Sequence, residues 1–427
     1  MKTKLLVPVL LLLSVGAAAQ TSRQEMSREP GRTGGSYFAY PGPAQKALTP
    51  APAGYEPFYI SHYGRHGSRY ILDNKYYRLV IGKLDTAATL GILSARGADL
   101  LQKLQKAYAD ACQRDGELTA LGGRQHRDIA RRMYGRFPSL LSRPLQVDAR
   151  SSTVGRCMLS MFYFTQELLE QNPGLEIRMD ASKRDMPFVV ENSRARIKKE
   201  PATEQYKAQV DAMQAQAINP ARLMKSLFTD VSKAESFVDG KQFMQALWDL
   251  VQDQQNVPEV GIDLSGIYTR EELFQLWNAG NASWLYRFGL VPGSTPNYLK
   301  QASVLDSLQA AADRVISEGG YGLSLRFSHD SSVLPLTYLM GLKEAMGARS
   351  GDLENLYKTI SIDKLIPMAA NIQLVFYRKE GSEDILVKFL LNENETTLPG
   401  LPATQAPFYR WTDVKSYWDS RREHTCK

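Results

Sequence analysis

Cysteine is scarce in this chain of 427 residues, which contains only Cys112, Cys157 and Cys426. Three cysteines are too few for a disulfide-stabilised scaffold, and none of them forms a CxxC motif for metal or redox chemistry. At most one disulfide can form, and its pairing is open among the three. Cys157 lies in an apolar helical stretch, which favours a buried, unreactive thiol.

Long hydrophobic runs are absent after the first twenty residues. Lys2 and Lys4 precede an apolar run from Leu5 to Val15, and small residues follow up to Ala19. The run is too short to span a bilayer and is typical of a secretory signal peptide. We therefore predict a signal peptide over 1–19, an exported protein (periplasmic or secreted) and no membrane span. Its removal takes away two lysines and no acids, so the net charge falls from +7 to +5.

Several catalytic sequence patterns are also missing. The chain has no GxxxxGK[ST] loop, no GxSxG elbow, no HExxH and no GxGxxG. The mildly basic charge is too weak for a nucleic-acid partner. His62 and His66 have a spacing found in zinc sites, but they lie on a strand and a turn, with no third ligand. We predict no metal and no cofactor. The oligomeric state is not determined by the sequence.

Composition divides the chain into four parts. Residues 20–54 are rich in glycine, proline and alanine and are predicted to form an extended N-terminal arm. Residues 55–179 and 321–427 alternate strands and helices, which predicts an α/β core: a sheet with helices on both faces. Residues 180–320 are polar and helix-prone, and are predicted to form an inserted, mainly helical lobe over the active site. The predicted helices are 75–109, 119–137 and 154–169, and the predicted strands include 145–148, 321–327, 370–378 and 384–391.

The most informative segment runs from Arg65 to Tyr70 and follows the apolar run 57–61. The clustered cations Arg65, His66 and Arg69 would repel one another unless an anion lies among them, and phosphate is the obvious anion. His66 also offers a neutral nitrogen that can attack phosphorus. A solvated basic turn is the alternative interpretation.

Two other predicted strands also end in charged residues. Arg150 follows the strand 145–148, and His329-Asp330 follows the strand 321–327. Ligands of α/β sheets bind in the crevice at the carboxyl ends of the strands. We therefore expect one crevice to contain Arg65, His66, Arg69, Arg150, His329 and Asp330.

These segments resemble the histidine phosphatase superfamily, in its acid phosphatase and phytase branch. The matching segments are 65–69 (RHGxRxP), 117–122 (GxLTxxG), 147–152 (a second-arginine segment, with Arg156 at the expected distance), 328–332 (HD) and 388–392 with 398–399. Residues 61–70 are similar to the multiple inositol polyphosphate phosphatases of that branch. Tyr70 or Ile71 stands where the motif has proline, and Asp330 follows His329 directly where that group commonly has His-Ala-Glu.

The resemblance implies a phosphatase of inositol polyphosphates such as phytate, and the residue chemistry agrees with it. Arg65, Arg69 and Arg150 are predicted to bind the phosphate oxygens, so that no metal is needed. His66 would form a phosphohistidine. His329 would add a donor when protonated, which favours acidic pH. Asp330 would protonate the leaving oxygen.

Other assignments are weighed against simpler ones. Lys183, Arg184 and Arg194 are candidates for contacts with phosphates that are not being cleaved, although such runs more often form a solvated helix face. His126, in a basic helical segment, is predicted to lie on a solvated face. A broad-specificity acid phosphatase or a sugar-phosphate (glucose 1-phosphate) phosphatase is the alternative function. A non-catalytic phosphate-binding protein is the alternative of another class.

Overall fold

A computed structural model describes residues 23–40, 46–191, 197, 203–349 and 351–423. The predicted signal peptide, Arg194 and Cys426 lie outside these residues. Cys112 is exposed and Cys157 is buried, and both are free thiols. Burial raises the pKa of the Cys157 thiol to about 12, which agrees with the predicted unreactive cysteine.

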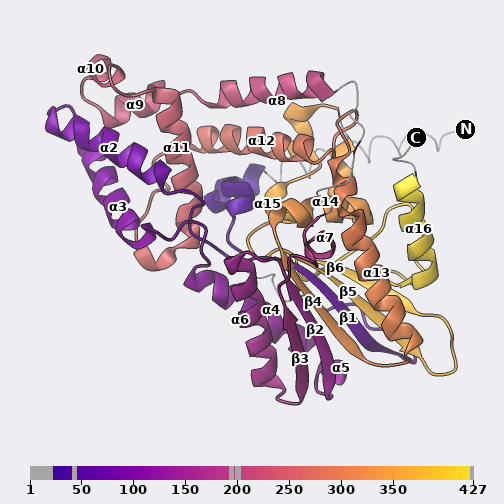
Figure 1. Cartoon of the computed structure of the whole chain (residues 1–427). Coiled ribbons are helices and arrows are strands. Elements are labelled where there is room, and N and C mark those ends of the chain that lie inside the picture. Colours follow the sequence, from indigo (N-terminus) through magenta and orange to yellow (C-terminus); the bar gives the residue numbers. More distant parts are fainter. Residues whose placement is uncertain (1–22, 41–45, 192–196, 198–202, 350, 424–427) are drawn as a thin grey trace, which may run out of the picture.

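The core of the molecule is one mixed sheet (Figure 1) with the strand order β3-β2-β4-β1-β5-β6-β7, and β8 pairs with β6. The first four strands in this order are parallel, and the others are antiparallel. The strands are β1 (Tyr55–Arg65), β2 (Leu145–Ser151), β3 (Leu175–Asp180), β4 (Gly322–Ser328), β5 (Asn371–Lys379), β6 (Leu386–Leu391), β7 (Asn394–Thr396) and β8 (Tyr409–Arg410). The predicted strands 145–148, 321–327, 370–378 and 384–391 are confirmed within a few residues.

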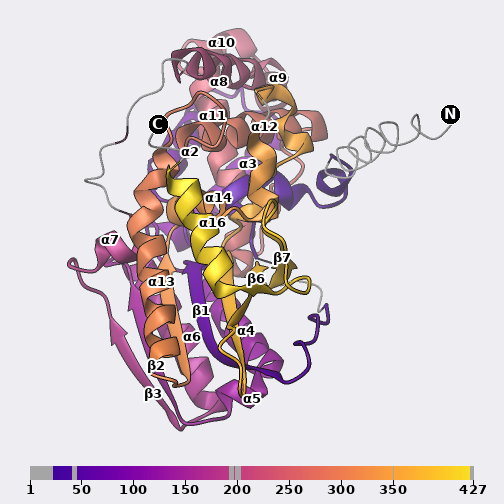
Figure 2. The same ribbon diagram turned by 90° about the vertical axis from the view of Figure 1, so that its right-hand side faces the viewer.

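Helices cover both faces of the sheet, so the predicted α/β class is confirmed (Figure 2). One face packs against α4 (Ala120–Arg136), α5 (Pro138–Leu141) and α6 (Gly155–Gln171). The other packs against α13 (Ala302–Ser317), α14 (Asp330–Met340) and α16 (Trp411–Glu423). Leu323, Leu325 and Phe327 of β4 face the first layer, and the residues between them face the second, as the twofold period of a strand requires.

A helical lobe with its own core stands beside the sheet. It is built from α2 (Lys75–Thr89), α3 (Ala95–Ala111), α9 (Ala221–Leu227), α10 (Val231–Glu235), α11 (Gly240–Asp253) and α12 (Arg270–Arg287). The predicted helix 75–109 is two helices, because the chain turns at Gly91 with φ of 67°. The residues that form the lobe do not coincide with the predicted interval 180–320. It recruits α2 and α3, whose apolar faces pack against α9 and α11, whereas α13 belongs to the sheet.

Most of the remaining elements add buried side chains to one of these cores. Their bounds are η1 (Pro30–Tyr37), α7 (Met186–Val189), α8 (Thr203–Ala217), η2 (Gln254–Asn256), η3 (Pro258–Val260), η4 (Asn297–Gln301), η5 (Lys343–Arg349), η6 (Leu353–Lys358) and α15 (Ile362–Leu365). No helix among the described residues is long and apolar enough to cross a membrane.

The N-terminal segment is not simply extended. Residues 30–37 form the 3-10 helix η1, and Thr33 and Ser36 within it are buried. Further along, the Tyr40 hydroxyl donates to the buried carboxylate of Glu393 at 2.9 Å. The glycines and prolines that suggested an extended arm instead allow a tight turn to pack between the two cores.

Candidate active site

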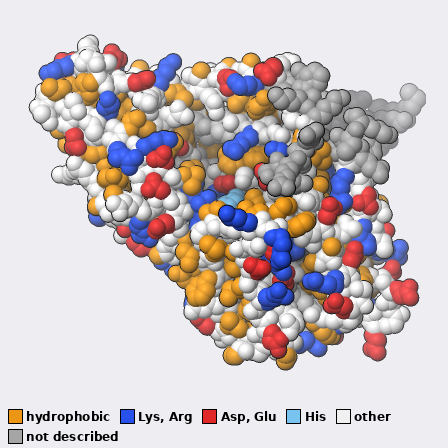
Figure 3. Space-filling model, in the orientation of Figure 1, with side chains coloured by type: hydrophobic (Ala, Val, Ile, Leu, Met, Phe, Trp, Pro, Cys, Tyr) orange, Lys and Arg blue, Asp and Glu red, His pale blue; other side chains and the backbone are white. Residues whose placement is uncertain are grey.

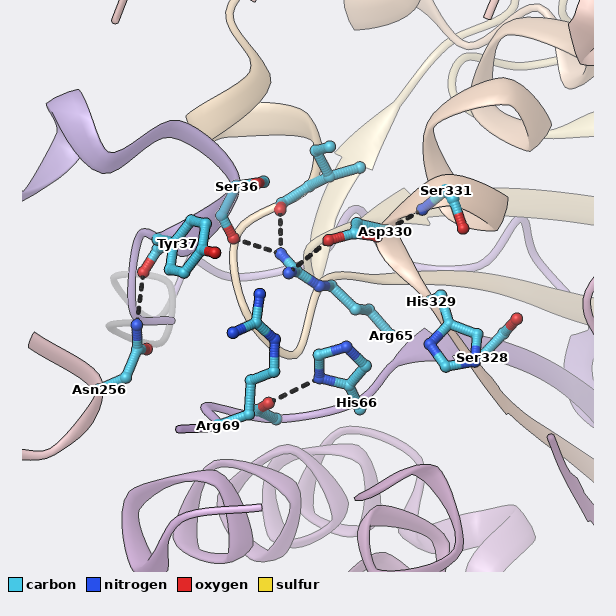
Figure 4. Close-up of polar contacts among 12 residues, drawn as sticks. Ser36, Tyr37, Arg65, His66, Arg69, Asn256, Ser328, His329, Asp330 and Ser331 are labelled. Carbon is cyan, nitrogen blue, oxygen red and sulfur yellow. Dashed lines mark hydrogen bonds and ion pairs between the residues drawn. The ribbon is translucent and has the colours of Figure 1, made fainter. Parts of the chain in front are cut away.

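The candidate site forms where two neighbouring parallel strands end. Arg65 closes β1 and is in register with Ser328, the last residue of β4. His66 therefore comes out of the sheet beside His329, and their ring centroids are 5.6 Å apart. Figure 4 shows His66 between Arg69 and His329, with Arg65 and Asp330 facing each other above them. The space-filling view shows histidine in a hollow between the helical lobe and the sheet (Figure 3).

The loop after His66 packs directly onto the start of α4. A Cβ atom at Gly67 would lie 2.5 Å from the Gly122 carbonyl oxygen, and one at Gly122 would lie 2.2 Å from the Ser68 carbonyl oxygen. Only glycine permits this approach at either position. Thr119 caps α4 by accepting a hydrogen bond from the Gly122 amide at 3.2 Å. The segments 65–69 and 117–122 therefore contact each other directly through their backbones.

The hydrogen bond of His66 determines which of its ring nitrogens carries the proton. Its Nδ1 lies 2.9 Å from the carbonyl oxygen of Gly67, so Nδ1 carries the proton and Nε2 keeps its lone pair. Burial lowers the pKa of His66 well below its ordinary value, and the charges of Arg65 and Arg156 lower it further. The imidazole is therefore neutral, which is the form that can attack phosphorus.

Arg65 is fully buried and held from three sides. Its Nη1 donates to the carbonyl oxygens of Ser36 and of Ile366, the latter at 2.7 Å. Its Nη2 donates to Oδ2 of Asp330 at 2.6 Å. Burial lowers the pKa of Arg65 to about 10, so the guanidinium is still charged at neutral pH.

Arg69 is positioned by residues of the helical lobe and of η1. Its guanidinium lies 4.7 Å from the centroid of the Tyr37 ring, and its Nη1 is 3.9 Å from the buried carboxylate of Asp253. Asn256 accepts from the Ser68 hydroxyl at 2.7 Å and donates to the Tyr37 carbonyl oxygen at 3.0 Å. Tyr37, Asp253 and Asn256 carried no sequence signal, because they lie far along the chain from the segment 65–69.

His329 and Asp330 stand at the start of α14. Nε2 of His329 lies 3.1 Å from the Ser152 hydroxyl. Burial, and then the charge of Arg156, lowers the pKa of His329 to about 4. Burial alone would raise the pKa of Asp330, but the charges of Arg65 and Arg69 outweigh it and hold that pKa below its ordinary value.

Arg150 does not join this cluster. Its Nε lies 3.1 Å from Asp148, and its Nη1 contacts Asp185 and lies 3.7 Å from Asp180. The reason is the alternation of side chains along β2: Val147 and Ala149 face α4 and α6, so Arg150 faces α13.

The third guanidinium of the site is that of Arg156. It stands in the first turn of α6, and its charge acts on His66 and His329. Burial lowers the pKa of Arg156, and its Nε has no hydrogen-bond partner among the described residues. Its Nη1 donates to the Gly116 carbonyl oxygen at 3.3 Å. The distance of Arg156 from the second-arginine segment points to this residue. The argument from strand ends favours Arg150 instead.

Other predicted residues lie outside the cluster. Lys183 and Arg184 are exposed in the loop between β3 and α7, and the Arg184 side chain pairs with Asp185 at 3.2 Å. His126 is buried rather than solvated, because its position on α4 faces the sheet: its ring packs against Phe327 with centroids 5.5 Å apart. No group of three or more potential metal-ligating side chains gathers among the described residues.

Comparison with known proteins identifies the family. Residues 64–392 match the model of the histidine phosphatase superfamily (branch 2). The chain belongs to this superfamily. As a member of branch 2 it is a histidine acid phosphatase, and the resemblance in the sequence is confirmed.

Individual relatives of this histidine phosphatase are distant. Multiple inositol polyphosphate phosphatase 1 of Gallus gallus is 23% identical over 395 residues, which cover 87% of this chain and 83% of the relative. The multiple inositol polyphosphate phosphatase of Bifidobacterium longum, solved in complex with inositol hexasulfate, superposes with a TM-score of 0.71 at 20% identity. That match covers 91% of this chain and 97% of the other. The phytase from D. castellii gives a TM-score of 0.66 at 15% identity, over 92% of this chain and 85% of the other.

Proposed function

We propose that this histidine phosphatase is an exported phosphomonoesterase that hydrolyses inositol polyphosphates, with phytate as the reference substrate. One observation carries the proposal: the charges of Arg65, Arg69 and Arg156 converge on a neutral His66. A dianionic phosphate is the ligand that compensates such a cluster, and the histidine adds the nucleophile that simple binding does not require. The inositol phosphatases among the relatives support the substrate class.

The proposed reaction has two steps. Nε2 of His66 attacks phosphorus in line, and the bond from phosphorus to the ester oxygen breaks. That oxygen takes its proton from Asp330, and the three guanidinium groups stabilise the charge on the equatorial oxygens. A water molecule then attacks phosphohistidine while the Asp330 carboxylate accepts its proton, and phosphate and free His66 are released.

Asp330 changes its protonation state when substrate binds. In this structure Arg65 holds it as a carboxylate. A bound phosphate competes for Arg65 and adds negative charge nearby, and both effects raise the pKa of Asp330. The substrate therefore induces the protonated form of the acid that its leaving group needs.

A second candidate, a sugar monophosphate phosphatase, is favoured by one specific observation. A cavity of about 320 Å³ adjoins Ser36 and Tyr37 between α8, α11 and α12. Its lining includes Trp248, Asp249 and Trp277, and it contains no lysine or arginine among the described residues. Such a wall suits uncharged hydroxyl groups better than additional phosphates.

Phosphate release separates the candidates. We expect a higher kcat/KM for phytate than for glucose 1-phosphate and p-nitrophenyl phosphate, measured from acidic to neutral pH. A preference for glucose 1-phosphate would favour the second candidate. Replacing Lys183 and Arg184 with alanine should raise KM for phytate alone if these residues bind phosphates that are not being cleaved, and the effect should weaken with salt.

Export is tested separately. The two lysines, the apolar run and the small residues at 17–19 support a cleaved leader. N-terminal sequencing of the mature protein from the periplasm or the medium should begin at Gln20.

A further inference from the structure

A cavity of about 330 Å³ lies outside the catalytic cluster, between α7, α13 and the strands β2 and β4. Its polar lining comes from Asp148, Arg150, Asp185, Ser307, Arg314 and Arg326. None of the catalytic side chains described above lines it. The cavity lies on the α13 face of the sheet, which Arg150 also faces. It has no part in the proposed phosphatase reaction.

Arg326 is the unusual residue of this cavity. It is only 5% exposed, in the middle of the sheet. Its Nη2 donates to the Ser307 hydroxyl at 3.1 Å, but its Nη1 is buried with no hydrogen-bond partner among the described residues. Burial lowers the pKa of Arg326, and the charge of Asp148 offsets this effect only in part. A buried guanidinium normally has an ion-pair partner, because leaving it alone is costly.

The charge of Asp148 acts on Arg326, but no direct ion pair joins Arg326 to a carboxylate among the described residues. Asp148 and Asp185 are both engaged by Arg150. Arg150 is also the register partner of Arg326 across β2 and β4, so two guanidinium groups stand side by side on one face. Arg314 on α13 lines the same cavity, and no ion pair joins it to a carboxylate among the described residues. Buried Arg326 and exposed Arg314 are therefore the lining cations that no ion pair engages among the described residues, although Asp148 and Asp185 also line the cavity.

We propose that this cavity is a second phosphate site, in which Arg326, Arg314 and Ser307 bind a phosphate group that is either free or esterified. The forked donors of arginine match phosphate oxygens. The site is separate from the site of hydrolysis. It stands on the cavity and on Arg326, whatever the substrate of the enzyme.

Equilibrium dialysis with radiolabelled inorganic phosphate tests the proposal. The wild-type protein should bind two phosphates per chain. Arg326→Gln should lose one and keep kcat/KM for p-nitrophenyl phosphate within about twofold, because it touches no catalytic group. The double variant Arg69→Gln/Arg156→Gln should lose the other phosphate together with activity.

A second arm identifies the source of the phosphate. Inositol hexakisphosphate binding is measured on His66→Ala, with and without Arg326→Gln. If Arg326→Gln weakens the binding of inorganic phosphate or of inositol hexakisphosphate about tenfold, the proposal is supported. The ligand that is affected shows which form the site binds. If neither ligand responds, the proposal is overturned. Should Arg326→Gln unfold, Arg314→Gln and Ser307→Ala on α13 replace it, and each must weaken the same binding.

Discussion

Arg65 and Asp330 form a hydrogen-bonded ion pair of 2.6 Å at the junction of β1 and α14. The pair joins the cation that would receive a phosphate to the acid that would protonate the leaving group. In the proposed mechanism, binding and proton transfer are coupled, because a phosphate that engages Arg65 would release Asp330.

Replacing His66 with alanine should abolish phosphatase activity and leave phosphate binding largely intact, because Arg65, Arg69 and Arg156 remain. Phosphohistidine trapped from the wild-type enzyme, without acid quenching, should map to position 66. Turnover above a few per cent of the wild-type rate in His66→Ala would contradict the assignment of the nucleophile.

Asp330→Asn should separate substrates by leaving group. An alkyl ester such as phytate needs a proton on its leaving oxygen, whereas p-nitrophenolate leaves without one. We expect kcat to fall far more for phytate than for p-nitrophenyl phosphate. Equal losses on both would mean that Asp330 only holds Arg65 in place.

The same residue should dominate the pH dependence of kcat. The protonated form of Asp330 in the substrate complex is lost as pH rises, so kcat for phytate should decline toward alkaline pH. The p-nitrophenyl phosphate profile should be flatter on that limb. Identical alkaline limbs for the two substrates would place the controlling ionisation elsewhere.

Arg156 and Arg150 provide a matched pair. Arg156→Gln removes a guanidinium that acts on His66, and kcat/KM should fall about a hundredfold or more. Arg150→Gln removes one that is committed to Asp148 and Asp185, and kcat/KM should stay within about threefold. The opposite order would restore the assignment made from the strand ends.

Asp253 should act on catalysis through Arg69. Asp253→Asn weakens the only carboxylate contact of Arg69 among the described residues, so KM should rise more than kcat falls, with kcat/KM lower by about tenfold. A loss of thermal stability with unchanged KM would show a purely structural role.

The buried histidines should weaken the fold at acidic pH. Burial lowers the pKa values of His62 and His126 from 6.5 to about 3. Between these two values the unfolded chain binds more protons than the folded one, so the free energy of unfolding decreases as pH falls from 6.5 toward 3.

Substitution of His126 by leucine should therefore reduce the drop in Tm between pH 7 and pH 4. Phe164→Leu, which alters the same packing without a titratable group, should lower Tm equally at both pH values. An unchanged drop in His126→Leu would mean that this histidine is not the one that is protonated on unfolding.

The sequence by itself determined those parts of the site that are contiguous in the chain. Arg65, His66 and Arg69 follow one strand and His329 and Asp330 follow another, so the rule that ligands bind at strand ends was enough to bring them together. Gly67, Gly122 and the helix cap Thr119 also belong to short contiguous motifs. Those motifs made the family recognisable.

Only the tertiary structure decided which other groups complete the site. The twofold period of β2 turns Arg150 to the α13 face, and the first turn of α6 carries Arg156 to His66 instead. Tyr37 of η1, Asp253 of α11 and Asn256 of η2 reach Arg69 and Ser68. His126 is buried because α4 packs on the sheet with the face that carries this residue, and the opposite face meets solvent. Such choices depend on which surfaces meet, and contacts between distant segments are not encoded in any local pattern of residues.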